Sequence, residues 1–211
     1  MVYEERTYRK SFRQSDLMHF QVVIKETDLD IGVYSKRYSP ELVKRAEEIT
    51  LKHRNQLEEY IKTHPEFLSS LRPVQVKPHA PAIAQQMADA AQKAGVGPMA
   101  AVAGAVAESV GIELSRHSRE VIIENGGDIY LRSNRKRCIG IYAGQSPFTG
   151  TIAIEIPPEI TPIGICTSSG TVGYSLSFGH ADGAILISNN TALANAAATA
   201  TAKRMKKPED I

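Results

Sequence analysis

Two segments of this sequence combine glycine with oxygen-bearing side chains, and a third places such side chains among alanines. The first is Asn125-Gly126-Gly127-Asp128. These residues follow an apolar run that is typical of a strand. Glycine permits positive φ angles and lets a ligand approach bare backbone amides, while Asp128 offers a carboxylate. We therefore regard all four as candidate ligand-binding residues. The alternative is a tight β-turn, and the octapeptide ENGGDIYL taken by itself favours the turn.

The second segment, residues 164–183, is rich in glycine, serine and threonine and lies between two apolar runs. Hydroxyls and free amides at this density can hold phosphate or carboxylate oxygens without a charged side chain. A flexible polar loop is the alternative interpretation. The ligand-binding candidates here are Thr167, Ser168, Ser169, Gly170 and Thr171.

The same segment contains three candidates for catalysis, Cys166, His180 and Asp182. Backbone amides of a glycine-rich loop can lower the pKa of a thiol, which would make Cys166 nucleophilic. A lone cysteine at the end of an apolar strand is more often a buried small hydrophobe. His180 and Asp182 could act as an acid/base pair, or they could merely face the same way on a strand and bond each other.

The third segment is ALANAAATATA, which contains the two metal-ligand candidates, Asn195 and Thr199. On a helix these residues share one face, so an amide oxygen and a hydroxyl can both point at one cation or one phosphate. Alternatively, the alanines let the helix pack closely against a sheet while Asn195 bonds locally.

The surrounding pattern predicts an α+β fold in which strands and helices position these segments. Residues 1–35 alternate like short antiparallel strands, and residues 39–65 form a long amphipathic helix with Ser39 as N-cap. The Ala- and Gly-rich helices near residues 98–113 and 191–203 are expected to be buried. We expect a single domain over residues 1–211, with residues 1–75 as a possible subdomain.

Composition excludes several classes of function. The 25 Lys and Arg residues against 23 Asp and Glu residues leave a net charge of +2, which argues against a broad positively charged surface for nucleic acid. The basic run Arg132, Arg135, Lys136 and Arg137 is interpreted as a solvated hairpin tip. The sequence has two cysteines, no secretory pattern and no apolar run that would span a membrane. We therefore expect a cytoplasmic protein.

The order of these motifs resembles the ApbE superfamily, known for flavin transferases that move FMN from FAD onto a protein threonine using magnesium. NGGDIYL followed by IGIYAG is similar to the family's Gly-Gly-Asp turn and returning strand, and ANAAATA is similar to its metal-binding helix. With GVGPMAAVAGAVAE, the match covers residues 95–203 and points to a short ApbE-like family of archaea and anaerobic bacteria. The resemblance implies mixed or antiparallel sheets.

The sequence departs from the transferases at the metal site and at the flavin site. Asn195 stands where they carry an acidic metal ligand, and Ala103-Gly104 stands where they carry lysine and glycine. We therefore expect a small-molecule or nucleotide ligand of phosphate-bearing or flavin type (FAD or FMN), weak magnesium binding and no standard FMN transfer.

The alternative that the family link implies is an accessory role in sulfide assimilation and homocysteine biosynthesis. In that role Cys166 would handle sulfur together with a protein partner. Whether the protein is an enzyme, and whether it forms a homo-oligomer, is left open by the sequence.

Overall fold

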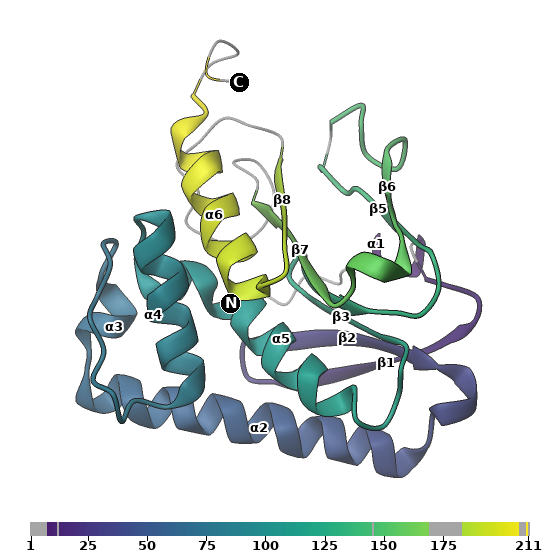
Figure 1. The fold of residues 1–211 in the computed structure, drawn as a ribbon, viewed down its shortest axis with the longest axis horizontal. Helices are drawn as coiled ribbons and strands as arrows, with labels where there is room; N and C mark the ends of the chain where they lie inside the picture. The colour runs from purple at the N-terminus through teal and green to yellow at the C-terminus, as the bar shows by residue number, and fades with distance from the viewer. Residues whose placement is uncertain (1–7, 12, 145, 169–182, 207–209, 211) are drawn as a thin grey trace.

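The computed structural model describes residues 8–11, 13–144, 146–168, 183–206 and 210. Its centre is a six-stranded sheet in which every neighbouring pair is antiparallel (Figure 1). The strand order is β1-β2-β3-β4-β7-β8, so the fold is α+β as predicted. The strands are β1 (Leu17–Ile24), β2 (Thr27–Tyr34), β3 (Val121–Asn125), β4 (Asp128–Arg132), β7 (Ile163–Ser168) and β8 (Ala184–Ser188).

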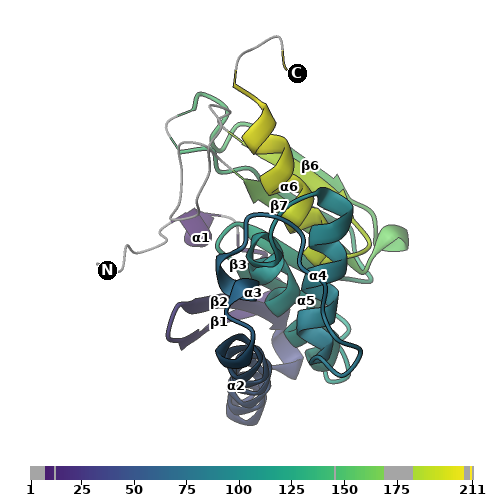
Figure 2. The same ribbon diagram turned by 90° about the vertical axis from the view of Figure 1, so that its left-hand side faces the viewer.

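Helices gather on one face of this sheet. They are α2 (Pro40–Thr63), α3 (Glu66–Ser69), α4 (Ala82–Ala94), α5 (Val102–Leu114) and α6 (Thr191–Arg204). Elsewhere along the chain, short 3-10 turns occur at Ser35–Arg37, Pro98–Ala101 and Pro158–Ile160. Figure 2 views α2 nearly end-on beneath β1 and β2. The helix begins as predicted, because Ser39 Oγ accepts a hydrogen bond from the Leu42 N–H and Pro40 takes the first helical position.

The two small-residue helices, α5 and α6, are both largely buried, which confirms their prediction as packing helices. Glycine makes their close approach possible. A Cβ atom added at Gly104 of α5 would lie 2.5 Å from the Thr191 carbonyl oxygen of α6. One added at Gly164 of β7 would lie 2.4 Å from the Thr191 Cα. The start of α6 is therefore wedged between α5 and the sheet.

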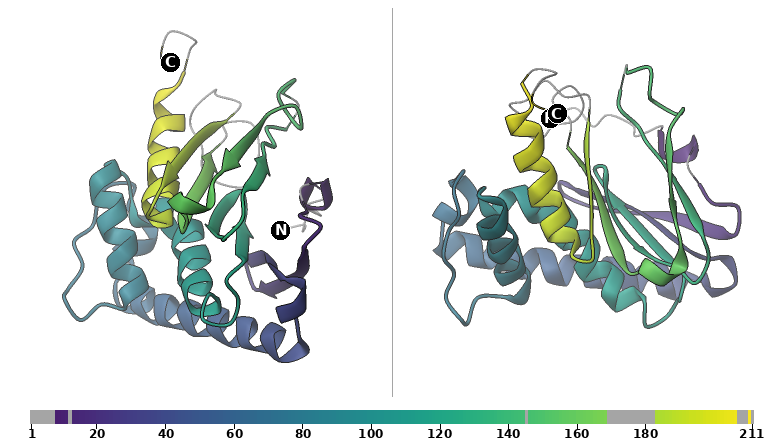
Figure 3. Two further views of the ribbon diagram at one scale, coloured as in Figure 1. Left: turned by 45° about the vertical axis from the view of Figure 1, so that its right-hand side comes forward. Right: turned by 45° about the horizontal axis from the view of Figure 1, so that its top comes forward.

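The other face of the sheet carries a smaller hairpin and a short N-terminal helix (Figure 3). Strands β5 (Arg137–Gly140) and β6 (Ala153–Ile156) pair with each other, and Ile139 and Ile156 pack on Ile122 and Ile165 of the main sheet. Helix α1 (Tyr8–Ser11) lies on this side as well, because Tyr8 stacks on Tyr142 with ring centroids 4.8 Å apart. Each face of the sheet thus has its own apolar cluster.

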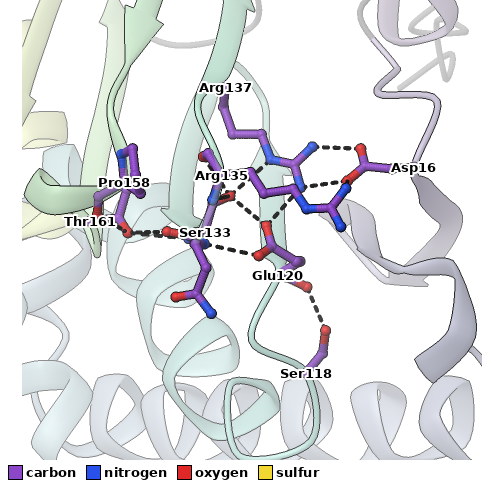
Figure 4. A network of polar contacts seen from close by, with 9 residues as sticks. Asp16, Ser118, Glu120, Ser133, Arg135, Arg137, Pro158 and Thr161 are labelled. Carbon is purple, nitrogen blue, oxygen red and sulfur yellow. Dashed lines mark hydrogen bonds and ion pairs between the residues drawn. The ribbon is translucent and has the colours of Figure 1, made fainter.

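The basic run between β4 and β5 is only partly a solvated tip, and the prediction is wrong for Arg137. That side chain is 3% exposed and donates to Asp16 Oδ1 at 2.6 Å and to Glu120 Oε2 at 2.7 Å (Figure 4). Ser133 Oγ lies 2.9 Å from Arg137 Nε in the same network. A buried guanidinium needs such partners, and the sequence pattern gave no sign that Asp16 and Glu120 would converge on it.

Among the described residues, no single helix is long and apolar enough to cross a membrane. Helix α4 and the segment Pro98–Leu114 reach the necessary length and apolar composition only together, as a pair bent by 103°.

Candidate functional site

The Asn125–Asp128 segment is a two-residue hairpin turn that joins β3 to β4. Asn125 pairs with Asp128, and the two glycines between them have φ values of 66° and 95°. Only glycine adopts such angles without strain, so the interpretation of this segment as a tight turn is confirmed. The Asn125 side chain is used structurally, because its Nδ2 donates to the Ala103 carbonyl oxygen at 3.1 Å.

The turn lies beside the end of β7, which carries the second sequence motif. The register places Asp128 directly opposite Cys166, so Thr167 and Ser168 continue alongside the turn. Among the described residues, a Cβ added at Gly127 would meet only the Thr167 carbonyl oxygen, at 3.9 Å. The other predicted residues of this loop and its flank, Ser169, Gly170, Thr171, His180 and Asp182, lie outside the described residues.

Asn195 of α6 completes the cluster from the helical side. Its Nδ2 donates to Asp128 Oδ2 at 2.9 Å, and its Oδ1 accepts from the Gly104 N–H at 3.1 Å. The amide thereby links three elements, β4, α5 and α6, in a buried position. The structure thus brings together parts of all three sequence motifs, although they are far apart along the chain.

Asp128 is the most perturbed of the carboxyl groups in this cluster. Burial raises its pKa to about 8, the nearby charge of Glu124 adds to the effect, and the Cys166 thiol and Thr167 N–H oppose it. Its Oδ1 atom is buried and has no hydrogen-bond partner among the described residues. At neutral pH the carboxyl group is therefore mostly protonated and can donate a hydrogen bond.

Cys166 is placed at the cluster but not as a nucleophile. Its side chain is fully buried, and its Sγ donates to the Thr191 carbonyl oxygen at 3.4 Å. Burial, followed by the neighbouring Asp128, raises the pKa of the thiol well above its ordinary value. A buried neutral thiol reacts poorly, so the geometry supports the alternative interpretation as a small core residue. The expected lowering of its pKa by loop amides is not what the structure shows.

The donors around Asn195 do not fit a divalent cation. The Asn195 oxygen that would bind the metal is already taken by the Gly104 N–H, and the amide nitrogen faces Asp128. Thr199 is half-buried one turn further along α6. Within the described part of the chain, no three His, Cys, Asp or Glu side chains form a metal-binding group. Magnesium requires several oxygen ligands, usually carboxylates, and this arrangement does not offer them.

Glu124 is a site residue that the sequence reasoning missed. Its Oε1 accepts the Gly127 N–H of the turn at 2.6 Å, and its carboxylate also contacts Tyr8 and Arg9 of α1. The sequence did contain a signal for this contact, because an acidic side chain three positions before Gly127 can accept a hydrogen bond from a backbone amide of the turn.

Glu108 is a second buried carboxylate without a recognisable sequence signal. Its Oε2 accepts from the Thr191 N–H at 3.0 Å and the Ala192 N–H at 3.4 Å, and Gln86 also donates to it. Burial raises its pKa, and these three donors oppose that effect. The contacts satisfy the free amides at the start of α6, so we interpret Glu108 as a structural cap of that helix.

A cavity of about 640 Å³ lies away from this cluster, between the C-terminal ends of α4 and α6, and is lined by Gly95, Ala200, Lys203 and Arg204 among others. Its basic side chains come from the C-terminal end of α6, where they complement the helix dipole and need no ligand to explain them. A smaller cavity, about 250 Å³, lies at the β5–β6 hairpin beside Arg13 and Cys138. We therefore build the site on the Asp128 cluster.

Comparison with known proteins identifies the family of the chain. A family model described as AbpE bacteria matches residues 9–211. The chain belongs to this family. Its relatives include UPF0280 proteins of methanogenic archaea. That of Methanocaldococcus jannaschii is 46% identical over 195 residues, or 90% of this chain and 78% of the relative. That of Methanococcus aeolicus is 37% identical over 210 residues, or 92% and 83%.

A solved structure shows the same fold at low sequence identity. The apo form of the Pseudomonas stutzeri flavinyl transferase ApbE has a TM-score of 0.52 and 12% identity, covering 94% of this chain and 88% of that one. The ApbE-like fold inferred from the sequence motifs is thereby confirmed. At this identity the likeness concerns the fold alone.

Proposed function

We propose that this member of the AbpE bacterial family binds a phosphate-bearing ligand of the flavin-nucleotide class, without transferring FMN. The ligand lies at the Asn125–Asp128 turn and the adjoining end of β7. One observation carries the proposal, namely the buried Asp128 Oδ1 atom, which has no hydrogen-bond partner in the described part of the chain where the two segments meet. Buried polar atoms are nearly always paired, and an unpaired one calls for a ligand, a water or a catalytic role.

The donors at this position suit an oxygen-rich ligand. A protonated Asp128 donates a hydrogen bond at neutral pH, as its pKa of about 8 implies. Thr167 and Ser168 add half-buried hydroxyls, and the open backbone at Gly127 allows a ligand to approach closely. Phosphate esters and sugar hydroxyls, both present in flavin nucleotides, match this set. The name of the ApbE structure with the same fold supports the choice of flavin.

The absence of transfer follows from the amide at Asn195. Transfer of FMN from FAD needs a cation to neutralise the diphosphate as it is attacked. Here the position that the family resemblance assigns to the metal ligand is occupied by an amide bonded to Gly104 and Asp128. Binding of the ligand is therefore independent of magnesium.

Flavin fluorescence tests this proposal. FMN and FAD are titrated with purified protein in EDTA, and the Asp128→Ala variant is compared with Asp89→Ala, a change at an exposed position on α4. We expect saturable quenching with wild type and Asp89→Ala, and an affinity about tenfold lower for Asp128→Ala, the effect of one lost hydrogen bond. Equal affinity of the two variants, or no quenching by wild type, would overturn the proposal.

A further inference from the structure

Glu124 connects the N-terminal helix α1 to the turn of the candidate site. Its Oε1 accepts from the Tyr8 hydroxyl at 2.8 Å and from the Gly127 N–H at 2.6 Å. Its Oε2 accepts from Arg9 Nε at 2.5 Å. One carboxylate thus ties a residue pair near position 9 to a turn more than a hundred positions away.

Arg9 is the centre of this connection. Its side chain is 7% exposed, and besides Glu124 it bonds Asp28 Oδ1 at 2.8 Å and the Asp28 carbonyl oxygen at 2.9 Å. Burial by itself lowers the pKa of Arg9, but the carboxylates of Glu124 and Asp28 raise it above its ordinary value. Arg9 therefore stays charged and compensates two buried carboxylates at once.

We propose that Arg9 is a positioning residue of the candidate site. It fixes the Glu124 carboxylate, which fixes the Gly127 amide, and this sets the turn that begins β4 at Asp128. Helix α1 is then part of the site although none of its residues faces the ligand. The inference deepens the proposed function and rests on it for its effect on binding, but the geometry that it predicts is measured without any ligand.

Loss of Arg9 has a specific consequence at the turn. Without the guanidinium, Glu124 keeps only the Tyr8 hydroxyl and the Gly127 N–H as donors, and its buried charge is left uncompensated. The carboxylate then turns toward solvent, so the Gly127 N–H loses a strong charge-assisted acceptor and the turn opens more often.

The chain offers a matched control in Arg137. Like Arg9, it is buried and bonds two carboxylates, here Asp16 and Glu120 (Figure 4). Unlike Arg9, its network has no contact with the Asn125–Asp128 turn among the hydrogen bonds of the described residues. Arg9→Gln and Arg137→Gln should therefore cost similar global stability, whereas only Arg9→Gln should act on the turn.

Amide hydrogen exchange by NMR separates the two variants. We expect exchange of the Gly127 N–H to be about tenfold faster in Arg9→Gln than in Arg137→Gln once both are corrected for global stability. Equal protection of Gly127 in the two variants would overturn the proposal, since Arg9 would then be only a stabilising residue.

A second variant keeps the test decisive if Arg9→Gln fails to fold. Glu124→Gln preserves the shape of the side chain but replaces the charged acceptor of the Gly127 N–H by a neutral amide and removes the charge that Arg9 compensates. We expect the Gly127 N–H to exchange faster in Glu124→Gln than in Arg137→Gln once both are corrected for global stability. Equal protection of Gly127 in these two variants would contradict the connection. If flavin fails to bind the wild-type protein while Arg9→Gln and Glu124→Gln both speed exchange of the Gly127 N–H, the proposed function is refuted and the positioning role of Arg9 stands.

Discussion

Asn195→Asp most directly tests the proposal that the Asn195 amide prevents metal binding at this site. In the native protein the Asn195 Nδ2 donates to Asp128 Oδ2 across 2.9 Å. The substitution replaces this donor by a second carboxylate oxygen at the same distance. At neutral pH Asp128 is mostly protonated, so the pair already shares one proton. If both groups were ionised, two unit charges about 3 Å apart would repel by about 6 kcal/mol at an effective dielectric constant of about 20, and a cation that replaces the proton removes this repulsion.

Magnesium should consequently stabilise Asn195→Asp and not the native protein. At a magnesium concentration about ten times the dissociation constant, binding contributes about 1.4 kcal/mol. For a chain of this size that raises the melting temperature by about 3 to 6 °C. The native protein should gain no stability from magnesium, because the Asn195 Oδ1 atom accepts from the Gly104 N–H and its Nδ2 atom faces the Asp128 carboxyl group.

Thermal unfolding with and without magnesium, at matched ionic strength, measures this difference. Asn190→Asp is the control, since Asn190 is the N-cap of the same helix and its Oδ1 accepts from the Leu193 N–H rather than facing a carboxylate. It should show no magnesium effect. The reasoning is refuted if native protein gains as much stability from magnesium as Asn195→Asp, or if Asn195→Asp gains none.

Three further outcomes are expected. Gly111→Ala should lower the free energy of unfolding in urea by about 2 kcal/mol or more, because its Cβ would lie 2.1 Å from a ring carbon of Tyr130; an unchanged midpoint would contradict this packing. Asp128 binds a proton in the folded state up to about pH 8 that the unfolded chain releases near its ordinary pKa of 3.8. Its contribution to stability should therefore fall by about 1.4 kcal/mol per pH unit between those values, and the slope should be shallower in Asp128→Asn. Iodoacetamide followed by mass spectrometry should label exposed Cys138 and spare Cys166; rapid labelling of folded Cys166 would show that it is accessible.

The sequence predicted those parts of the fold that depend on local features, such as a helix cap, a glycine turn or a run of small residues. Ser39 and Pro40 mark the start of α2, and two glycines with positive φ mark the turn between β3 and β4. The small residues of α5 and α6 predicted their burial, because such helices gain stability only by close packing. Arg137 was missed, since its burial depends on Asp16 and Glu120, which are distant in sequence.

Three residues of the candidate cluster were selected from the sequence, but Glu124 and the chemistry of the cluster were not predicted. Asp128, Cys166 and Asn195 were selected from three motifs, and the register of β4 with β7 brings them together. Their ionisation depends on burial and on distant partners, which no local pattern reveals. The Cys166 thiol therefore has a raised pKa rather than a lowered one, and the Asn195 Oδ1 atom accepts a hydrogen bond from the Gly104 N–H.

The carboxyl carbon of Asp128, observed by ¹³C NMR while FMN is added in EDTA, tests the central claim most directly. If the unpaired Oδ1 atom meets the ligand, FMN should shift this resonance in a saturable way without any divalent cation. The shift should follow the same binding curve as the flavin fluorescence. An Asp128 resonance that stays unchanged while FMN reaches millimolar concentration would contradict the account.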